Sequence, residues 1–112
     1  MISSKQTAEH YNWGQNCDGW HLLKSNTLSV IEERLPFNSS EKLHYHERAQ
    51  QLFYILSGTA TFTIANETII VNANQSIHIA KKTVHKISNN YSDDLCFLVI
   101  SEPKSHEDRI DV

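Results

Sequence analysis

The stretch LHYHERAQQLFYILSG, residues 43–58, decides the fold that we expect for this chain. Its two histidines, His44 and His46, are two residues apart, and no helical period surrounds them. On a strand, residues with this spacing point to the same face. Two imidazoles about 7 Å apart on one face can converge on one metal ion with Zn–N bonds of roughly 2.0–2.1 Å.

The residues after the histidines read as an apolar strand that begins at Gln51. Residues 51–57 are apolar on both faces, and Phe53 and Ile55 share the face of Gln51. Two apolar faces are typical of the centre of a sandwich or of a subunit interface. Gly58 ends the strand at a tight turn, where a residue without Cβ has the lowest conformational cost.

A second stretch, NQSIHIAKKTVHKISN at residues 74–89, reads as a strand, a turn and another strand that includes His85. Together the two stretches resemble the two sequence motifs of the cupin superfamily. The first family motif runs His-x-His, three or four residues, Glu, six residues and Gly, and this chain has Gln51 at the Glu position. In the second motif His85 and Asn89 match. Three other positions depart from the family's Gly, Pro and Gly: Asn74, Ala80 and Lys82.

The rest of the chain reads as short strands separated by polar turns, without a convincing long helix. Apolar patterns predict about nine strands, at residues 20–24, 28–35, 43–46, 51–57, 59–64, 68–71, 76–80, 84–89 and 95–100. Regularly spaced short strands are typical of an all-β sandwich or barrel. The resemblance, which covers residues 28–100, implies the double-stranded β-helix, or jelly-roll barrel, of the cupins.

Three parts are expected on this basis. Residues 1–20 form an N-terminal arm, residues 21–101 the cupin barrel, and residues 102–112 a charged C-terminal tail. We expect the arm to pack along a sheet, of this chain or of a partner subunit, with Trp13 and Trp20 as anchors. A role for either tryptophan in stacking on a ligand is the alternative.

Length and composition exclude several classes of protein. A chain of 112 residues forms one domain with a modest core. Its net charge of −3 gives no basic face for nucleic acid, and no apolar run reaches the roughly 18 residues of a membrane span. The N-terminus lacks the apolar segment of a signal peptide, so we expect a cytoplasmic protein in which Cys17 and Cys96 are reduced.

The resemblance implies that His44, His46, Gln51 and His85 converge inside the barrel on a divalent transition metal, whether Zn, Fe, Ni, Mn or Cu. The amide of Gln51 is the main departure, and the other register of the motif offers Gln50, which is also an amide. Without a carboxylate ligand the ion keeps its full 2+ charge, which strengthens it as a Lewis acid and attracts anions. An amide oxygen is also a weaker donor, so metal affinity should fall.

An amide cannot act as a general base, so any base must come from His78, Glu32 or Glu33. His78 lies between two isoleucines, and we expect it on the surface or behind the ligands. Glu32 and Arg34 should be solvated unless their face of the strand turns inward and orients a polar ligand. Three further histidines lie outside the motifs and take no role in this prediction: His10, His21 and His106.

Two functions follow. The first is a small metal-binding cupin enzyme that acts on a small polar or anionic metabolite, either like a sugar or sugar-phosphate isomerase or like a dioxygenase. The chain looks most like the small cupins grouped with the cupin domain of mannose-6-phosphate isomerases. The alternative is a non-catalytic module that binds a sugar or carboxylate. Since many small cupins dimerise by packing their sheets, we also expect a homodimer.

Overall fold

The computed structural model describes all residues from 1 to 112 and contains twelve strands and no helix. The chain therefore has no helix that is long and apolar enough to cross a membrane. The strands follow the chain in this order: β1 (Glu9–Trp13), β2 (Cys17–Lys24), β3 (Ser29–Leu35), β4 (Ser39–Ser40), β5 (His44–His46), β6 (Gln50–Ser57), β7 (Thr59–Ile64), β8 (Glu67–Asn72), β9 (Ser76–Ile79), β10 (His85–Asn89), β11 (Leu95–Glu102) and β12 (Arg109–Asp111).

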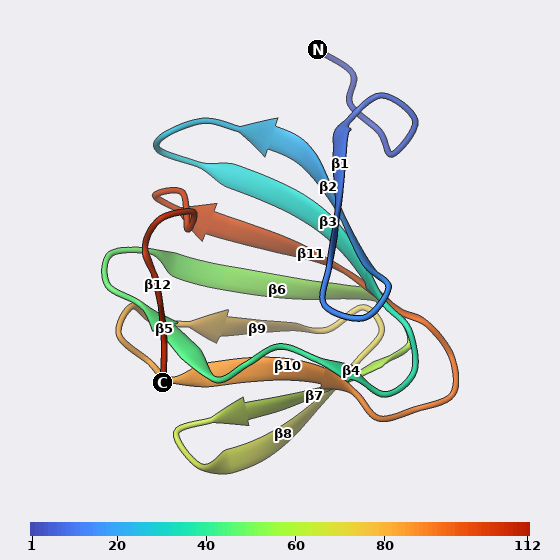
Figure 1. Cartoon of the computed structure of the whole chain (residues 1–112), viewed down its shortest axis with the longest axis vertical. Helices are drawn as coiled ribbons and strands as arrows, with labels where there is room; N and C mark the ends of the chain where they lie inside the picture. Colours follow the sequence, from blue (N-terminus) through green and yellow to red (C-terminus); the bar gives the residue numbers. More distant parts are fainter.

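The strands form two antiparallel sheets that close into the expected jelly-roll barrel (Figure 1). One sheet has the order β1-β2-β3-β11-β6-β9, and the other has the order β12-β5-β10-β7-β8, with β4 paired beside β10. Neighbours in each sheet come from distant parts of the sequence, such as β3 and β11. The topology thus brings the two histidine-bearing strands, β5 and β10, together as direct neighbours.

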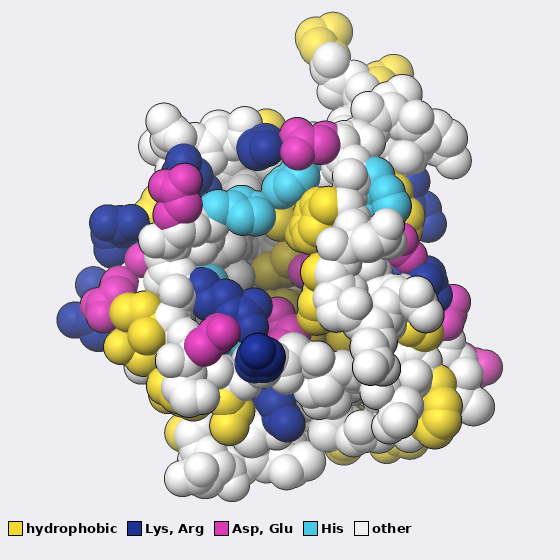
Figure 2. Space-filling view, viewed as in Figure 1, with side chains coloured by type: hydrophobic (Ala, Val, Ile, Leu, Met, Phe, Trp, Pro, Cys, Tyr) yellow, Lys and Arg dark blue, Asp and Glu magenta, His cyan; other side chains and the backbone are white.

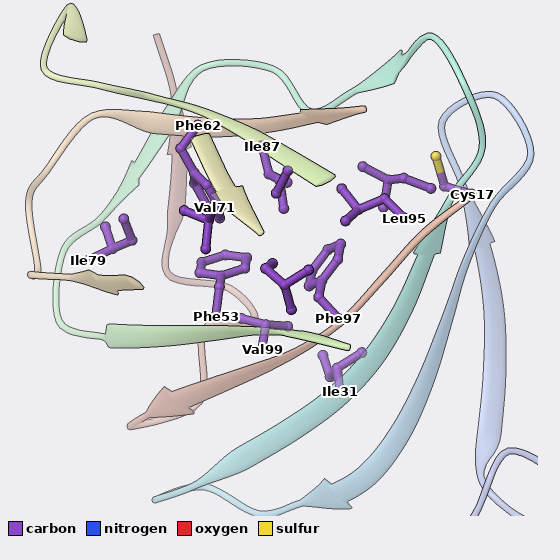
Figure 3. Close-up of a cluster of buried hydrophobic side chains, with 13 residues drawn as sticks. Cys17, Ile31, Phe53, Phe62, Val71, Ile79, Ile87, Leu95, Phe97 and Val99 are labelled. Atoms are coloured by element: carbon purple, nitrogen blue, oxygen red, sulfur yellow. The ribbon is translucent and has the colours of Figure 1, made fainter. Parts of the chain in front are cut away.

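The apolar core lies between the two sheets because their strands alternate buried and half-buried side chains. In β11, for example, Leu95, Phe97 and Val99 are buried, while the residues between them are half-buried. Phe53 meets Phe62 edge-on with ring centroids 5.1 Å apart, and it meets Phe97 at 5.6 Å (Figure 3). Aromatic pairs of this kind contribute about 0.5–1.5 kcal/mol each beyond their buried area.

All nine predicted strands are present, and the structure adds β1, β4 and β12. These three lack the apolar alternation that marks a strand in the sequence, and pairing with a neighbour holds each in place. β1 pairs with β2 along its whole length, and β12 pairs with β5. β2 also begins at Cys17, earlier than the expected residue 20. The region expected as an arm therefore contains β1 at the edge of a sheet, and the region expected as a tail contains β12.

Two departures from the second cupin motif keep the backbone conformation for which glycine is suited. Asn74 has a φ of 67° and Lys82 a φ of 65°, both in the left-handed region. At Gly58, by contrast, φ is +83° and an added Cβ would lie 2.5 Å from the carbonyl oxygen of Asp94. Turns at residues 74 and 82 can thus form without glycine, whereas the turn at residue 58 requires it.

Candidate metal centre

Three histidine side chains meet where β5 lies against β10. The alternation of β5 buries His44 and His46 and leaves the residue between them half-buried, and His85 is directly opposite His44 in the strand pair. The ring centroids of His44 and His85 are 4.4 Å apart, and those of His44 and His46 are 5.2 Å apart. One nitrogen from each of the three rings lies within 4.8 Å of the others, so the cluster could hold one metal ion.

Backbone carbonyls fix the proton on two of these rings. His44 Nδ1 donates to the carbonyl oxygen of Lys42 at 2.7 Å, and His85 Nδ1 donates to that of Thr83 at 2.8 Å. Because a carbonyl only accepts hydrogen bonds, Nδ1 carries the proton and Nε2 keeps its lone pair. Outer hydrogen bonds of this kind are the usual support of metal-binding histidines.

The three rings are neutral at physiological pH. Burial, with the neighbouring histidines as a smaller cause, lowers the pKa of His44 and His46 from 6.5 to about 4. Burial also lowers the pKa of His85. Since metals bind the deprotonated imidazole, the cluster is ready to act as a ligand set without losing protons first.

Gln51 presents its amide oxygen beside this cluster. Its side chain is 6% exposed and lines the same cavity as His44 and His46. Gln51 Nε2 donates to Ser101 Oγ at 3.0 Å, which fixes the orientation of the amide. The opposite atom, Oε1, is buried without a hydrogen-bond partner.

This donor set fits a divalent transition ion. Three buried atoms of this donor set lack any protein partner: His46 Nδ1, His85 Nε2 and Gln51 Oε1. A buried polar atom without a partner costs about 1–3 kcal/mol, and imidazole nitrogens and an amide oxygen are both suitable ligands for such ions. An ion bound among these atoms would offset this cost.

A cavity of about 300 Å³ opens beside the cluster. In the space-filling view it is the central hollow, with histidine and basic side chains near its rim and acidic and hydrophobic side chains within it (Figure 2). It is lined by Tyr11, Trp13, Ile31, Glu33, Glu41, His44, His46, Gln51, Phe53, Val99, Ser105, His106, Glu107 and Arg109.

Two carboxyl groups in this cavity have unusual surroundings. Glu33 is 8% exposed, and burial and the nearby Glu41 raise its pKa to about 8, although the Trp13 side chain opposes the shift. Glu41 accepts a hydrogen bond from the backbone N–H of Ile87 at 3.2 Å, and its Oε2 lies 3.9 Å from Arg109 Nη1. Burial raises the pKa of Glu41 to about 7, although Arg109 opposes the shift. Both carboxyl groups thus hold a proton more tightly than an exposed glutamate does.

The C-terminal segment forms one wall of the cavity. Residues 105–107 and Arg109 line it, and β12 places Arg109 opposite His46. Asp108 anchors the segment, because its buried carboxylate accepts hydrogen bonds from the backbone N–H groups of Arg48 at 3.0 Å and Ala49 at 2.9 Å. The charged tail expected from the sequence therefore contributes side chains to the site.

Only one of the three expected bases lines the cavity, and it is Glu33. His78 is exposed on β9 and lies outside the cavity, as expected. Glu32 and Arg34 do not line the cavity, in agreement with the expectation that their face of the strand points outward. Arg34 instead forms ion pairs with Asp18 at 2.7 Å and with Asp94 at 3.2 Å.

Sequence reasoning missed Glu41, His106 and Arg109, which also line the cavity. His106 had no predicted role, and Glu41 lies between two predicted strands, at residues 28–35 and 43–46. Trp13 lines the cavity and also packs against the apolar core, so both roles considered for it remain open, whereas Trp20 lies outside the cavity beneath the ammonium group of Lys5.

An all-antiparallel jelly-roll barrel with an internal cluster of three histidines defines the class of this protein. The chain belongs to the Cupin domain family (Cupin_2), whose model matches residues 31–101. It is also 36% identical over 89 residues to the uncharacterized protein MJ1618 of Methanocaldococcus jannaschii, a match that covers 79% of this chain and 71% of the relative. The resemblance to the cupin superfamily is therefore confirmed.

Solved structures share the fold over nearly the whole chain. A predicted oxalate decarboxylase from Thermotoga maritima has a TM-score of 0.86 at 23% identity, over 93% of this chain and all of that one (100%). KdgF from Halomonas sp. has a TM-score of 0.84 at 12% identity, over 93% and 95% of the two chains. The nucleoside dehydratase Pac13 from Streptomyces has a TM-score of 0.81 at 15% identity, over 100% and 90%. These likenesses establish the fold.

Proposed function

We propose that this protein is a metal-dependent enzyme that moves protons on a small polar metabolite, as isomerases, epimerases and dehydratases do. One observation carries the proposal. Two histidines of the cluster, His44 and His46, line a single cavity of about 300 Å³ together with the buried Glu33 and the half-buried Glu41, and His85 completes the cluster beside this cavity. Fold alone does not determine function, so the proposal rests on these side chains.

The ligand set consists of His44, His46 and His85, with Gln51 Oε1 as a further oxygen donor. An ion held there would polarise a carbonyl or hydroxyl group of the substrate. Ser101 keeps the Gln51 oxygen in position, and the carbonyls of Lys42 and Thr83 keep the rings in the tautomer that leaves Nε2 free.

Glu33 and Glu41 handle the protons in this proposal. A general acid or base works best when its pKa is close to the working pH, and the pKa values of about 8 and about 7 satisfy this condition. Glu33 holds a proton that it can donate, and Glu41, whose charge Arg109 favours, accepts one. Two carboxyl groups with different surroundings thus take the two opposite roles.

This chemistry favours the isomerase-like function over the dioxygenase-like one, because oxygen chemistry needs no such pair of protonatable groups. Membership of the group that includes the cupin domain of mannose-6-phosphate isomerases stays a prediction. The Pac13 structures support the general idea, since that protein is a nucleoside dehydratase and structures of three of its variants contain uridine.

A binding module without turnover is the second candidate, and Gln51 is the observation that favours it. An amide in place of the family's carboxylate weakens the ligand set and removes a possible base. In that case the cavity would hold a sugar or carboxylate, and the buried carboxyl groups would serve as hydrogen-bonding partners of the ligand.

We also propose that the chain forms a homodimer through the outer face of the β11–β6 region. Leu98 lies opposite Tyr54, and Ile100 lies opposite Leu52. These four side chains are only half-buried in the single chain, and Leu56 beside them is 39% exposed. Sedimentation equilibrium tests this proposal. Wild type should be dimeric and Leu98→Glu monomeric, and a monomeric wild type would contradict it.

Deuterium exchange tests the enzymatic proposal. Metal-loaded protein is incubated in D2O with a panel of aldoses, ketoses, sugar acids, sugar phosphates and nucleosides, and 1H NMR follows C–H exchange and new products. Wild type should process at least one compound. Glu33→Gln should lose about 10²–10⁴-fold in rate, whereas the control Glu32→Gln, on the outer face of the same strand, should keep it.

Two outcomes would contradict the enzymatic proposal. Binding of panel compounds without exchange or product would favour the non-catalytic module. If both Glu33→Gln and Glu41→Gln retain turnover, the two carboxyl groups do not transfer the protons.

A further inference from the structure

We propose that a second cavity, between the β2–β3 turn and the segment before β12, binds an oxyanion such as a phosphate or carboxylate group. The metabolite that occupies the metal cavity would carry this group at its remote end. The second statement rests on the proposed function, whereas the first stands without it.

The second cavity has a volume of about 410 Å³ and no hydrophobic residue in its lining. It is lined by Lys24, Ser25, Asn26, Ser29, Lys104, His106 and Glu107. The two segments that form it are joined, because the backbone N–H of Lys104 donates to the carbonyl oxygen of Asn26 at 3.3 Å. The cavity is therefore built from two parts of the chain that hold each other in place.

The charges in the lining favour an anion. Two lysines face one acidic residue, Glu107, although the whole chain has a net charge of −3. Lys24 donates to Glu9 at 3.2 and 3.3 Å, while Lys104 makes no ion pair. An ammonium group without a partner beside a polar cavity is well suited to a phosphate or carboxylate oxygen.

A buried hydroxyl gives independent support. Ser29, the first residue of β3, is 1% exposed, and its Oγ has no hydrogen-bond partner. Nearby, the ring of His21 packs against that of His106 at 5.2 Å, and His21 Nδ1 is also buried without a partner. Buried polar groups are nearly always hydrogen-bonded in native proteins. A ligand with several acceptor oxygens would complete the bonding of the Ser29 hydroxyl.

The position of the cavity indicates what the oxyanion belongs to. His106 and Glu107 line both this cavity and the one lined by His44 and His46. One molecule could thus reach across the exposed His106 side chain, with its polar end among the histidines and its anionic end near Lys104. The substrate class that follows is a small metabolite with a phosphate or carboxylate group remote from the reacting carbon.

Titration with inorganic phosphate tests the site on the full chain. Amide chemical shifts in 1H–15N NMR spectra are followed at constant ionic strength, with chloride as the reference salt. We expect saturable shifts in residues 24–29 and 104–107. Lys104→Gln and Ser29→Ala should each weaken binding by at least about tenfold, and Lys81→Gln, at an exposed turn that does not line the cavity, should leave binding unchanged.

Parallel titration with acetate distinguishes phosphate from carboxylate as the preferred group. Shifts that do not saturate, or that Lys104→Gln and Ser29→Ala leave unchanged, would overturn the site.

The double variant His44→Ala/His85→Ala separates this inference from the proposed function. Phosphate should still bind to the double variant in the second cavity, and Lys104→Gln should keep the wild-type metal content. If phosphate binds while no panel compound is turned over, the site stands and the proposed enzymatic function fails. If only compounds without phosphate or carboxylate are turned over, the link between the two cavities is wrong.

Discussion

His44 and His85 are directly opposite each other in the β5–β10 pair, and their ring centroids lie 4.4 Å apart. The two motifs of the sequence therefore meet through one strand pairing. Two imidazoles this close in a buried site disfavour each other's protonation, because each charge would oppose the other. The neutral form of the cluster, which could hold a metal ion, is thus a property of the fold itself.

The first prediction concerns acid. Since the pKa of His44 and His46 is lowered from 6.5 to about 4, the folded state binds fewer protons than the unfolded state in this range. The free energy of unfolding of the metal-free protein should therefore fall by about 1–3 kcal/mol between about pH 7 and pH 5. Urea unfolding at each pH measures it. His44→Gln/His46→Gln should lose most of this dependence, and an unchanged slope would contradict the assignment.

The second prediction has the opposite sign. Because the pKa of Glu33 is raised from 4.5 to about 8, the folded state binds more protons than the unfolded state between these values. This contribution to stability is lost as the pH rises. Relative to wild type, Glu33→Gln should gain about 1–3 kcal/mol in unfolding free energy between about pH 5 and pH 8. The outward-facing control, Glu32→Gln, should show no such gain, and a flat Glu33→Gln difference would rule out burial of a protonated carboxyl.

The third prediction concerns the wall that Asp108 anchors. Asp108→Asn keeps the shape of the side chain but removes the negative charge that accepts hydrogen bonds from the backbone N–H groups of Arg48 and Ala49. The free energy of unfolding should therefore fall by about 1–3 kcal/mol. Those N–H groups lower the pKa of Asp108, so the difference from wild type should shrink as the pH falls below its ordinary value of 3.8. Urea unfolding measures the cost, and amide exchange at Arg48 and Ala49 should become faster. Asp111→Asn, an exposed control on β12, should change little.

The fourth prediction uses the turn after β9. Lys82 has a φ of 65°, a conformation that costs a residue with a Cβ about 1–2 kcal/mol. Lys82→Gly relieves this cost, whereas Lys81→Gly, next to it and without a positive φ, only adds flexibility and should destabilise by about 0.5–1 kcal/mol. Thermal unfolding should thus separate the two variants by about 1–2 kcal/mol. Equal destabilisation in both would mean that the left-handed backbone at Lys82 carries no strain.

Local patterns were sufficient to predict an all-β sandwich or barrel, whereas the jelly roll and the convergence of the histidines were implied by the resemblance to the cupins. The two-residue spacing of His44 and His46 determines that they share a face, and the motif spacing brought in Gln51 and His85. Sequence period alone also separated Glu33 from Glu32, since neighbours on a strand face opposite ways. What it left open was which of the two faces is the inner one.

The remaining wall of the site depends on pairing between distant segments, which a single sequence does not reveal. Arg109 reaches the cavity because β12 pairs with β5, and this short strand has no buried residue of its own. Glu41 is held by the backbone N–H of Ile87 on β10. His106 lines the cavity because the hydrogen bonds of Asp108 hold this segment in place. In each case a backbone contact between distant segments places the residue in the cavity, and the residue type alone does not predict that contact.

Metal content tests the central claim most directly. Untagged protein purified without chelator, and then incubated with Zn, Mn, Ni or Fe, is examined by elemental analysis beside Gln51→Glu and His44→Ala/His85→Ala. The account predicts about one transition metal ion per chain in wild type, retention in Gln51→Glu, where a carboxylate replaces the amide, and loss in the double histidine variant. A wild type that stays empty while Gln51→Glu fills, or a double variant that keeps its full metal content, would contradict it.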